Sequence, residues 1–148
     1  MTRKIASTFV ALVAAVALLS GCGAASPIQT SENYAPSDGV RLEFSNGVRL
    51  ENFFLLTADE GAPVRLMGAI VNDAESDADV QLDIDGQLVE VTAPASGVLN
   101  LEAEEIVIEG VSALPGTNLA VMINSGGSQT YEIPVLDGTL PPYDEFLP

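Results

Sequence analysis

The sequence predicts an all-β fold, an immunoglobulin-like Greek-key β-sandwich of about seven to nine strands. Three observations support this prediction. Turn-forming residues recur about every eight to twelve residues between positions 40 and 135. Short runs between these turns alternate apolar and polar residues, as strands with one buried face do. No long run has the spacing of an amphipathic helix.

The N-terminus is typical of a secretory signal peptide. A short basic segment precedes an uncharged, mostly apolar stretch, Ile5–Leu19. The four residues Leu19-Ser20-Gly21-Cys22 resemble the lipobox of bacterial lipoproteins. That resemblance implies cleavage of residues 1–21 after Gly21 and attachment of acyl chains to Cys22, which anchor a protein on the outer side of the cell membrane.

Residues 22–38 are rich in Gly, Ala, Ser and Pro, which predicts a flexible tether between the lipid and a domain at 39–135. The mature chain keeps three Arg and no Lys against 21 Asp and Glu, a formal charge of −18 (3 − 21). Nucleic-acid binders need clustered basic residues, so we expect no nucleic-acid partner.

The first predicted strands form a hairpin. Val40–Phe44 and Val48–Leu56 flank Asn46-Gly47, a pair that favours a two-residue turn with positive φ at both positions. Residues 53–56 are apolar at every position, which predicts either a bulge near Asn52 or a strand buried on both faces.

The remaining predicted strands follow turn signals. Val64–Val71 is interrupted by Gly68, and a further hairpin turns at Asp85-Gly86. Pro115-Gly116 predicts a type II turn, and Pro134 predicts an edge or bulged position because proline has no N–H. The other strands are predicted at 80–84, 88–91, 98–101, 106–108, 119–123 and 131–135, the last two joined across Ser125–Ser128.

Several short stretches carry a family resemblance. They are 34–39, Leu55–Val71 with Leu66–Asn72, Ile108–Val111, Leu114–Gly116 and Ile133–Val135 with the Pro/Tyr-containing tail. Together they resemble actinobacterial LpqE-like small lipoproteins, distant relatives of the periplasmic PCu(A)C-type copper chaperones. The resemblance implies a cupredoxin-like β-sandwich and raises the question of copper.

The copper ligands implied by that family are two His and two Met. This sequence has no His, and its mature Met residues are Met67 and Met122. Thioethers suit Cu(I), but two of them without imidazole make an incomplete site. The alternative is that both Met side chains fill gaps in the core.

A second candidate metal site is acidic. Asp73, Glu75, Asp77 and Asp79 lie two residues apart, and oxygen ligands at alternate positions are used in Ca²⁺-binding loops. The glycine and the flanking helices of an EF-hand are absent. The alternative is a solvated loop leading into an acidic edge strand, whose charge opposes aggregation.

No pattern of catalytic residues is present. The sequence has no His, no Trp, no phosphate-binding loop and no nucleophile elbow, so we expect neither an enzyme nor a cofactor. The tail 136–148 is Pro-rich and carries apolar residues, among them Tyr143, Phe146 and Leu147. These residues either dock on a partner or fold back on the domain.

The sequence therefore predicts a membrane-anchored lipoprotein that works as a non-catalytic binding or accessory module. A protein partner in the cell envelope, such as a respiratory-chain complex, is expected. The alternative function is metal binding, as a copper-chaperone-like protein without His ligands or as a Ca²⁺-binding protein.

Overall fold

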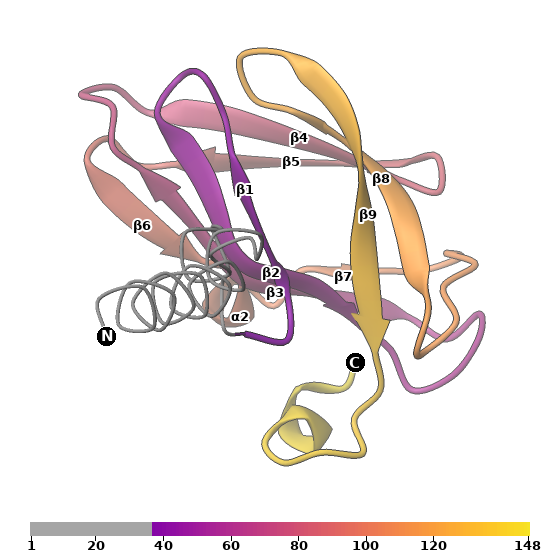
Figure 1. Ribbon diagram of the computed structural model, residues 1–148. Coiled ribbons are helices and arrows are strands. Elements are labelled where there is room, and N and C mark those ends of the chain that lie inside the picture. The colour runs from indigo at the N-terminus through magenta and orange to yellow at the C-terminus, as the bar shows by residue number, and fades with distance from the viewer. Residues whose placement is uncertain (1–36) are drawn as a thin grey trace, which may run out of the picture. The chain divides into compact units, whose positions relative to one another are not determined.

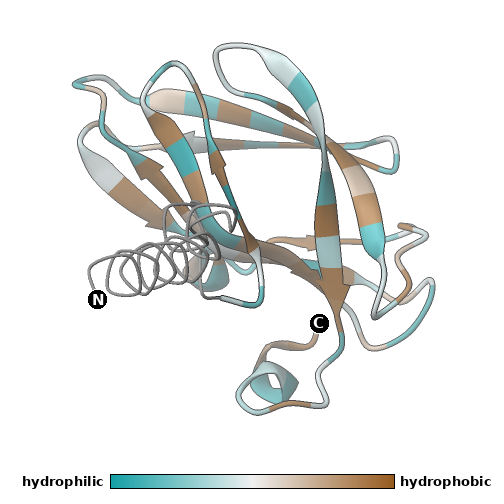
Figure 2. Ribbon diagram, viewed as in Figure 1, coloured by the Kyte–Doolittle hydropathy of each residue, from teal (hydrophilic) through white to brown (hydrophobic). Residues whose placement is uncertain are grey.

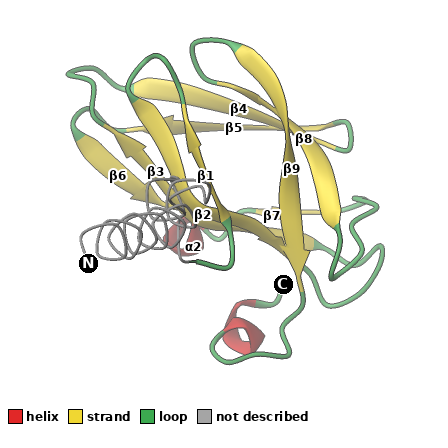
Figure 3. Ribbon diagram, viewed as in Figure 1, coloured by secondary structure: helices red, strands yellow, loops and turns green. Residues whose placement is uncertain are grey.

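The computed structural model describes residues 37–148, so the predicted signal peptide, Cys22 and most of the predicted tether lie outside the described residues. Strands dominate this part of the chain, with two short helical segments (Figures 1 and 3). The elements are β1 (Val40–Glu43), β2 (Val48–Leu56), β3 (Val64–Asn72), β4 (Ala78–Ile84), β5 (Gln87–Ala93), β6 (Gly97–Asn100), α2 (Leu101–Glu104), β7 (Val107–Ile108), β8 (Asn118–Asn124), β9 (Ser128–Leu136) and η2 (Tyr143–Phe146).

The strands form one sheet that bends into two layers and nearly closes into a barrel. Its order is β5-β4-β8-β9-β2-β3-β6, with β1 also on β2 and β7 also on β3. We call β1, β2, β3, β6 and β7 the first layer, and β4, β5, β8 and β9 the second layer. β9 joins them, because it pairs antiparallel with β8 and, at Val135 and Leu136, parallel with β2. The all-β sandwich prediction is confirmed.

The core lies between the layers. Inward residues of both layers are buried, among them Leu50, Phe53, Leu82, Ile123 and Ile133. Apolar and polar residues alternate along the strands of the second layer (Figure 2), as expected for strands with one buried face. Such burial is the dominant favourable contribution to folding.

The first hairpin turns differently from its prediction. The amide of Gly47 donates to the carbonyl of Phe44 at 3.3 Å, and Phe44 donates to Val48 at 2.9 Å. The loop therefore has three residues, Ser45 to Gly47, and only Gly47 has positive φ (+83°). The arrangement is a type I turn closed by a glycine bulge, the alternative that a three-residue loop favours.

Both expectations for residues 52–56 are confirmed together. The β2–β3 register shifts between Glu51 and Phe54, and Asn52 has φ +50°, which marks a bulge. Beyond the bulge, Phe53 faces the main core, while Phe54 belongs to a second apolar cluster on the opposite side of the strand. The backbone of Asn52 is approached closely by Gly68, where a Cβ would lie 2.5 Å from the Asn52 carbonyl oxygen.

Two later turns match their predictions. Asp85 and Gly86, both with positive φ, close the β4–β5 hairpin as a two-residue turn. The amide of Thr117 donates to Leu114 at 3.2 Å across Pro115-Gly116, and Gly116 has φ +79°, as a type II turn requires.

The segment after β6 was assigned incorrectly. The predicted strand at 98–101 ends at Asn100, and Leu101 begins the one-turn helix α2. The Asn100 side chain accepts from the amide of Glu102 and caps this helix, which short polar residues do well. The predicted strand at 106–108 is likewise reduced to Val107–Ile108.

Pro134 occupies an edge position, as predicted. Its neighbour Val135 donates to Thr117 and accepts from Gly116, so the nitrogen of Pro134 is directed away from β8. β9 does not pair with β2 before Val135, so no strand lies where an N–H of Pro134 would point. The missing N–H of Pro134 therefore costs no hydrogen bond between strands. No helix among residues 37–148 combines the length and apolarity needed to cross a bilayer.

Candidate binding surfaces

Part of the outer face of the first layer is covered by the chain's own tail. Phe54, Leu56 and Met67 form the second buried cluster, and the partly buried side chains that pack on it are Leu136, Tyr143, Phe146 and Leu147. The Tyr143 ring lies edge-on to Phe54 with centroids 5.2 Å apart. The tail therefore folds back, and the three apolar residues considered for partner docking contact this domain.

A hydrogen bond fastens the tail at its middle. The Tyr143 hydroxyl donates to the Asp38 carboxylate at 2.5 Å. This bond, aided by partial burial, raises the pKa of Tyr143 to about 12. Nearby, Thr139 donates its hydroxyl and amide to Asp137, which lowers the pKa of that carboxyl.

Arg65 links the tail to α2. Its guanidinium donates to the carbonyl of Phe146 at 3.3 Å and to the carbonyl of Glu102 at 2.9 Å. It also lies 5.5 Å from the centre of the Phe146 ring. Since the side chain is only 11% exposed, Arg65 acts as a buried clamp rather than a free surface cation.

The two methionines do not form one site. Met67 is fully buried beneath the tail on the outer face of the first layer, so the core-filling alternative describes it. Met122 is 45% exposed, between two inward residues of β8, on the outer face of the second layer. These faces lie on opposite sides of the core, so the two thioethers cannot hold the same ion, and the core-filling alternative fails for Met122.

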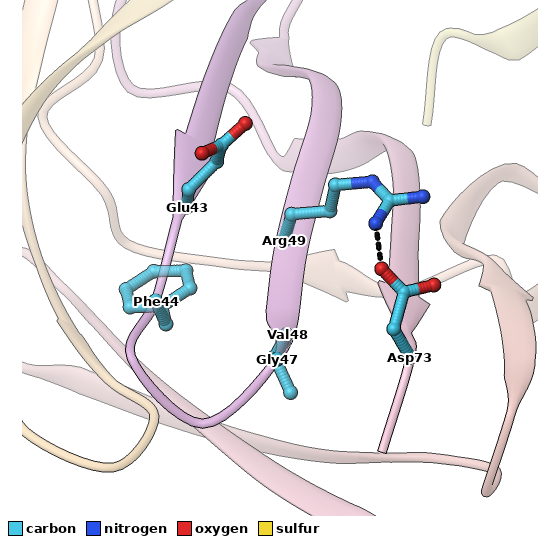
Figure 4. Close-up of a pocket in the computed structure, with 6 residues that line it drawn as sticks. All are labelled: Glu43, Phe44, Gly47, Val48, Arg49 and Asp73. Atoms are coloured by element: carbon cyan, nitrogen blue, oxygen red, sulfur yellow. Dashed lines mark hydrogen bonds and ion pairs between the residues drawn. The ribbon is translucent and has the colours of Figure 1, made fainter.

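The four alternating carboxylates are also dispersed. Asp73 pairs with Arg49 (Figure 4), Asp77 accepts from the amide of Ala95 at 2.8 Å, and Asp79 accepts from Thr92 at 2.8 Å. Glu75 is exposed. Among residues 37–148 no three His, Cys, Asp or Glu side chains are placed to hold a metal. The Ca²⁺ interpretation is therefore not supported by the geometry.

A shallow depression borders the first hairpin. It measures about 180 Å³ and is lined by Glu43, Phe44, Gly47, Val48, Arg49 and Asp73 (Figure 4). The Asp73 carboxylate raises the pKa of Arg49 through a hydrogen bond. Because Asp73 and Glu51 already bind its guanidinium, Arg49 offers little to an anionic ligand.

Charge differs strongly between the two layers. The strands of the first layer carry three arginines, Arg41, Arg49 and Arg65, against two carboxylates, Glu43 and Glu51. The strands of the second layer carry Asp79, Asp83, Glu90 and Glu132 and no basic residue. The outer face of that layer also exposes Leu88 and Met122, at 69% and 45%. Sequence reasoning missed this face, although the alternation of 80–91 already placed Asp83 and Glu90 opposite the buried residues.

The sheet has an open seam where its two ends approach each other. β5 is one end of the strand order, and β6 is the other. Of the exposed large apolar side chains of the described domain, Leu88, Val98 and Val107 lie on β5, β6 and β7, the strands that flank this seam.

Comparison with known proteins identifies the fold. No family model and no curated protein matches this chain. A solved structure described as a copper-bound PCuAC domain from PmoF2 is similar, with a TM-score of 0.50 and 15% identity over 66% of this chain and 98% of that chain. The domain has a PCuAC-like fold, in agreement with the resemblance to the distant PCu(A)C relatives.

Proposed function

We propose that this chain is a non-catalytic binding module, anchored to the membrane through acylated Cys22, whose second layer faces a basic protein partner. The observation that carries the proposal is the charge of that layer: three of its four strands carry carboxylates, four in all, and none carries a basic residue. The apolar part of the first layer's outer face is less suited to binding, because the tail and Arg65 already cover Phe54, Leu56 and Met67.

Electrostatic complementarity favours a basic partner. Carboxylates on one face accelerate association with a positively charged surface, and this effect weakens as salt rises. Leu88 and Met122 supply apolar contact area within the same face. A subunit of an envelope or respiratory-chain complex is the partner class that the LpqE-like resemblance suggests.

The test is recovery of the partner with the intact, acylated protein in detergent. Asp83→Asn with Glu132→Gln removes two of the four negative charges on the strands of the second layer and keeps the shapes of both side chains. We expect this variant to recover less partner at low salt. The matched control is Glu104→Gln with Glu105→Gln, two exposed acidic residues at α2 on the other layer. Equal recovery by both variants would contradict the proposal.

The anchor is tested separately. Cys22→Ala removes the only thiol of the chain, so it should abolish labelling by an alkyne fatty acid. The variant should then be either released or left with its signal peptide uncleaved. Labelling equal to that of the unaltered protein would show that Cys22 is not the acylated residue.

Copper transfer is the second candidate, and the likeness to a copper-bound PCuAC domain favours it. The donor set of residues 37–148 does not fit this role, because it contains no imidazole and its two thioethers lie on opposite faces. Titration with Cu(I) separates the candidates. Stoichiometric copper that survives dialysis and is lost in Met122→Leu would favour copper transfer over the binding module.

A further inference from the structure

We propose that β5 is a docking edge, at which an extended segment of the partner protein adds as a strand and closes the seam of the barrel. This inference rests on the proposed function and specifies how the partner binds. The occupant has apolar residues on the face that turns inward and a lysine or arginine beside Glu90 on the face that turns outward.

β5 is the strand of the described domain best suited to such pairing. It has seven residues, in continuous register with β4, and contains no Pro, no Gly and no bulge. The other strands with a free side are protected. β1 and β6 have four residues each and β7 has two, while the free side of β9 ends at Pro134. Short length and proline are two of the devices that normally prevent edge pairing, and β5 lacks both; it keeps a third, a charged side chain, in Glu90.

The hydrogen-bonding pattern shows which groups of β5 are free. Ile84 and Gln87 flank a two-residue turn, so they form a hydrogen-bonded pair, and the pattern alternates from there. Asp83, Gln81 and Asp79 then form non-hydrogen-bonded pairs with the β5 residues opposite them, which are Leu88, Glu90 and Thr92. Side-chain bonds of Gln81 to Glu90 at 3.4 Å and of Thr92 to Asp79 at 2.8 Å agree with this assignment, because side chains lie closer in such pairs.

Three residues of β5 therefore direct their backbone N–H and C=O groups toward the seam. They are Leu88, Glu90 and Thr92, and all three are exposed. The far end of the strand is held in place, since the buried Asn72 side chain donates to the carbonyl of Ala93 at 3.2 Å. A fixed strand with unpaired backbone groups loses little conformational freedom when a second strand binds.

The side chains around the seam define the occupant. Val89 and Val91 point inward but are only partly buried, so inward apolar residues of an added strand would complete their burial. Outward residues would lie near exposed Leu88 and Val98, whose side chains are 69% and 59% accessible. Glu90, at the middle of β5, favours a basic residue at the neighbouring outward position.

A second copy of this chain is the wrong occupant. Antiparallel pairing of two β5 edges about a two-fold axis, with all seven residues paired, would centre on Glu90 and place its carboxylate beside the same carboxylate of the other copy. Like charges at neighbouring positions destabilise a sheet, and each chain also carries a formal charge of −16.

The test uses the full chain in detergent and a labelled peptide of alternating valine and lysine with the length of β5, seven residues. Fluorescence anisotropy measures binding, and hydrogen exchange locates it. We expect the peptide to bind, to slow exchange in residues 87–93, and to bind better than a matched peptide of alternating valine and glutamate.

Variants separate backbone pairing from charge. Glu90→Gln removes the charge and keeps the outward N–H, whereas Glu90→Pro also removes the N–H without breaking a bond to β4. We expect the proline variant to bind at least about tenfold more weakly than the glutamine variant. If Glu90→Pro fails to fold, Leu88→Lys places a like charge at the edge and should weaken binding of the lysine peptide. The control is Glu104→Gln, an exposed carboxylate at α2 on the other layer.

Several results would overturn the inference. They are no binding of the lysine peptide, equal binding to Glu90→Pro and Glu90→Gln, protection of another segment, or self-association of the chain that Glu90→Pro abolishes. If the peptide fails but neutralisation of Asp83 and Glu132 still weakens partner recovery, the proposed function stands and only the docking edge is wrong.

Discussion

Replacing Gly68 with alanine should be among the most damaging single-methyl changes in this domain. Gly68 lies in β3 with φ +108°, a conformation that alanine rarely adopts. An added Cβ would lie 2.5 Å from the carbonyl oxygen of Asn52 and 2.7 Å from that of Glu51. Both oxygens belong to the backbone of the β2 bulge, so neither can move without changing the pairing of β2 with β3.

The size of the effect follows from two contributions. Alanine with positive φ costs about 1–2 kcal/mol through clash of its Cβ with its own backbone. Forcing an extra methyl group into a packed site adds about 1–3 kcal/mol. Gly68→Ala should therefore lower the free energy of unfolding by about 2–5 kcal/mol. Gly61→Ala is the matched control, because Gly61 has φ +76° but no atom within 4 Å of the added Cβ. It should cost about 1–2 kcal/mol.

Urea unfolding of both variants, followed by circular dichroism, measures this difference. The domain beginning at Ala24 is suitable, since all contacts in question lie within residues 37–148. If both variants lose the same stability, the close approach of Gly68 to the bulge carries no energetic weight and the reasoning fails.

Three further predictions concern the tail and the acidic loop. The neutral Tyr143 phenol donates a hydrogen bond to Asp38, so the contribution of this bond to the free energy of unfolding is complete below pH 10 and is lost as the pH rises toward 12. Unfolding followed against pH should show no such loss in Tyr143→Phe. Arg65→Met leaves the carbonyls of Phe146 and Glu102 without their donor, so it should lower the free energy of unfolding by about 1–3 kcal/mol and speed proteolysis of the tail. An unchanged cleavage rate would show that Arg65 does not hold the tail. Combined replacement of Asp73, Glu75, Asp77 and Asp79 by Asn or Gln should leave circular dichroism unchanged, because amide oxygens can still accept the bonds made to Ala95 and Thr92.

Local chemistry made the strands and several turns predictable. The Asp85-Gly86 and Pro115-Gly116 turns are each determined by a few residues that are neighbours in the sequence, and the structure has both turns as predicted. The Asn46-Gly47 turn failed because the register of β1 on β2 selects a three-residue loop, and register depends on packing of the whole hairpin.

The candidate surfaces depended on longer-range relations. The sequence showed that residues 53–56 were apolar on both sides, but the tail that covers Phe54 and Leu56 comes some eighty residues later. The seam was equally hidden, because it exists only where β5 and β6 become the two ends of one sheet. The sequence predicts only that Leu88 is a strand residue, since alternation shows which face a residue occupies and not whether its strand has a neighbour on both sides.

All three arginines of the described domain lie in the first layer, so the strands of the two layers differ in formal charge, +1 (3 − 2) in the first layer and −4 (0 − 4) in the second. β1, β2 and β3 carry Arg41, Arg49 and Arg65, while the carboxylates of β4, β5 and β9 have no basic neighbour on the strands of their own layer. Close to an anionic bilayer, the strands of the second layer are repelled more than those of the first, which favours an orientation with the second layer outward, although the carboxylates of α2 and the tail oppose it. At physiological salt this torque acts only within about 8 Å of the surface. A domain on a longer tether would tumble freely until it drifted toward the membrane, where its acidic face would be presented to whatever stands above the bilayer.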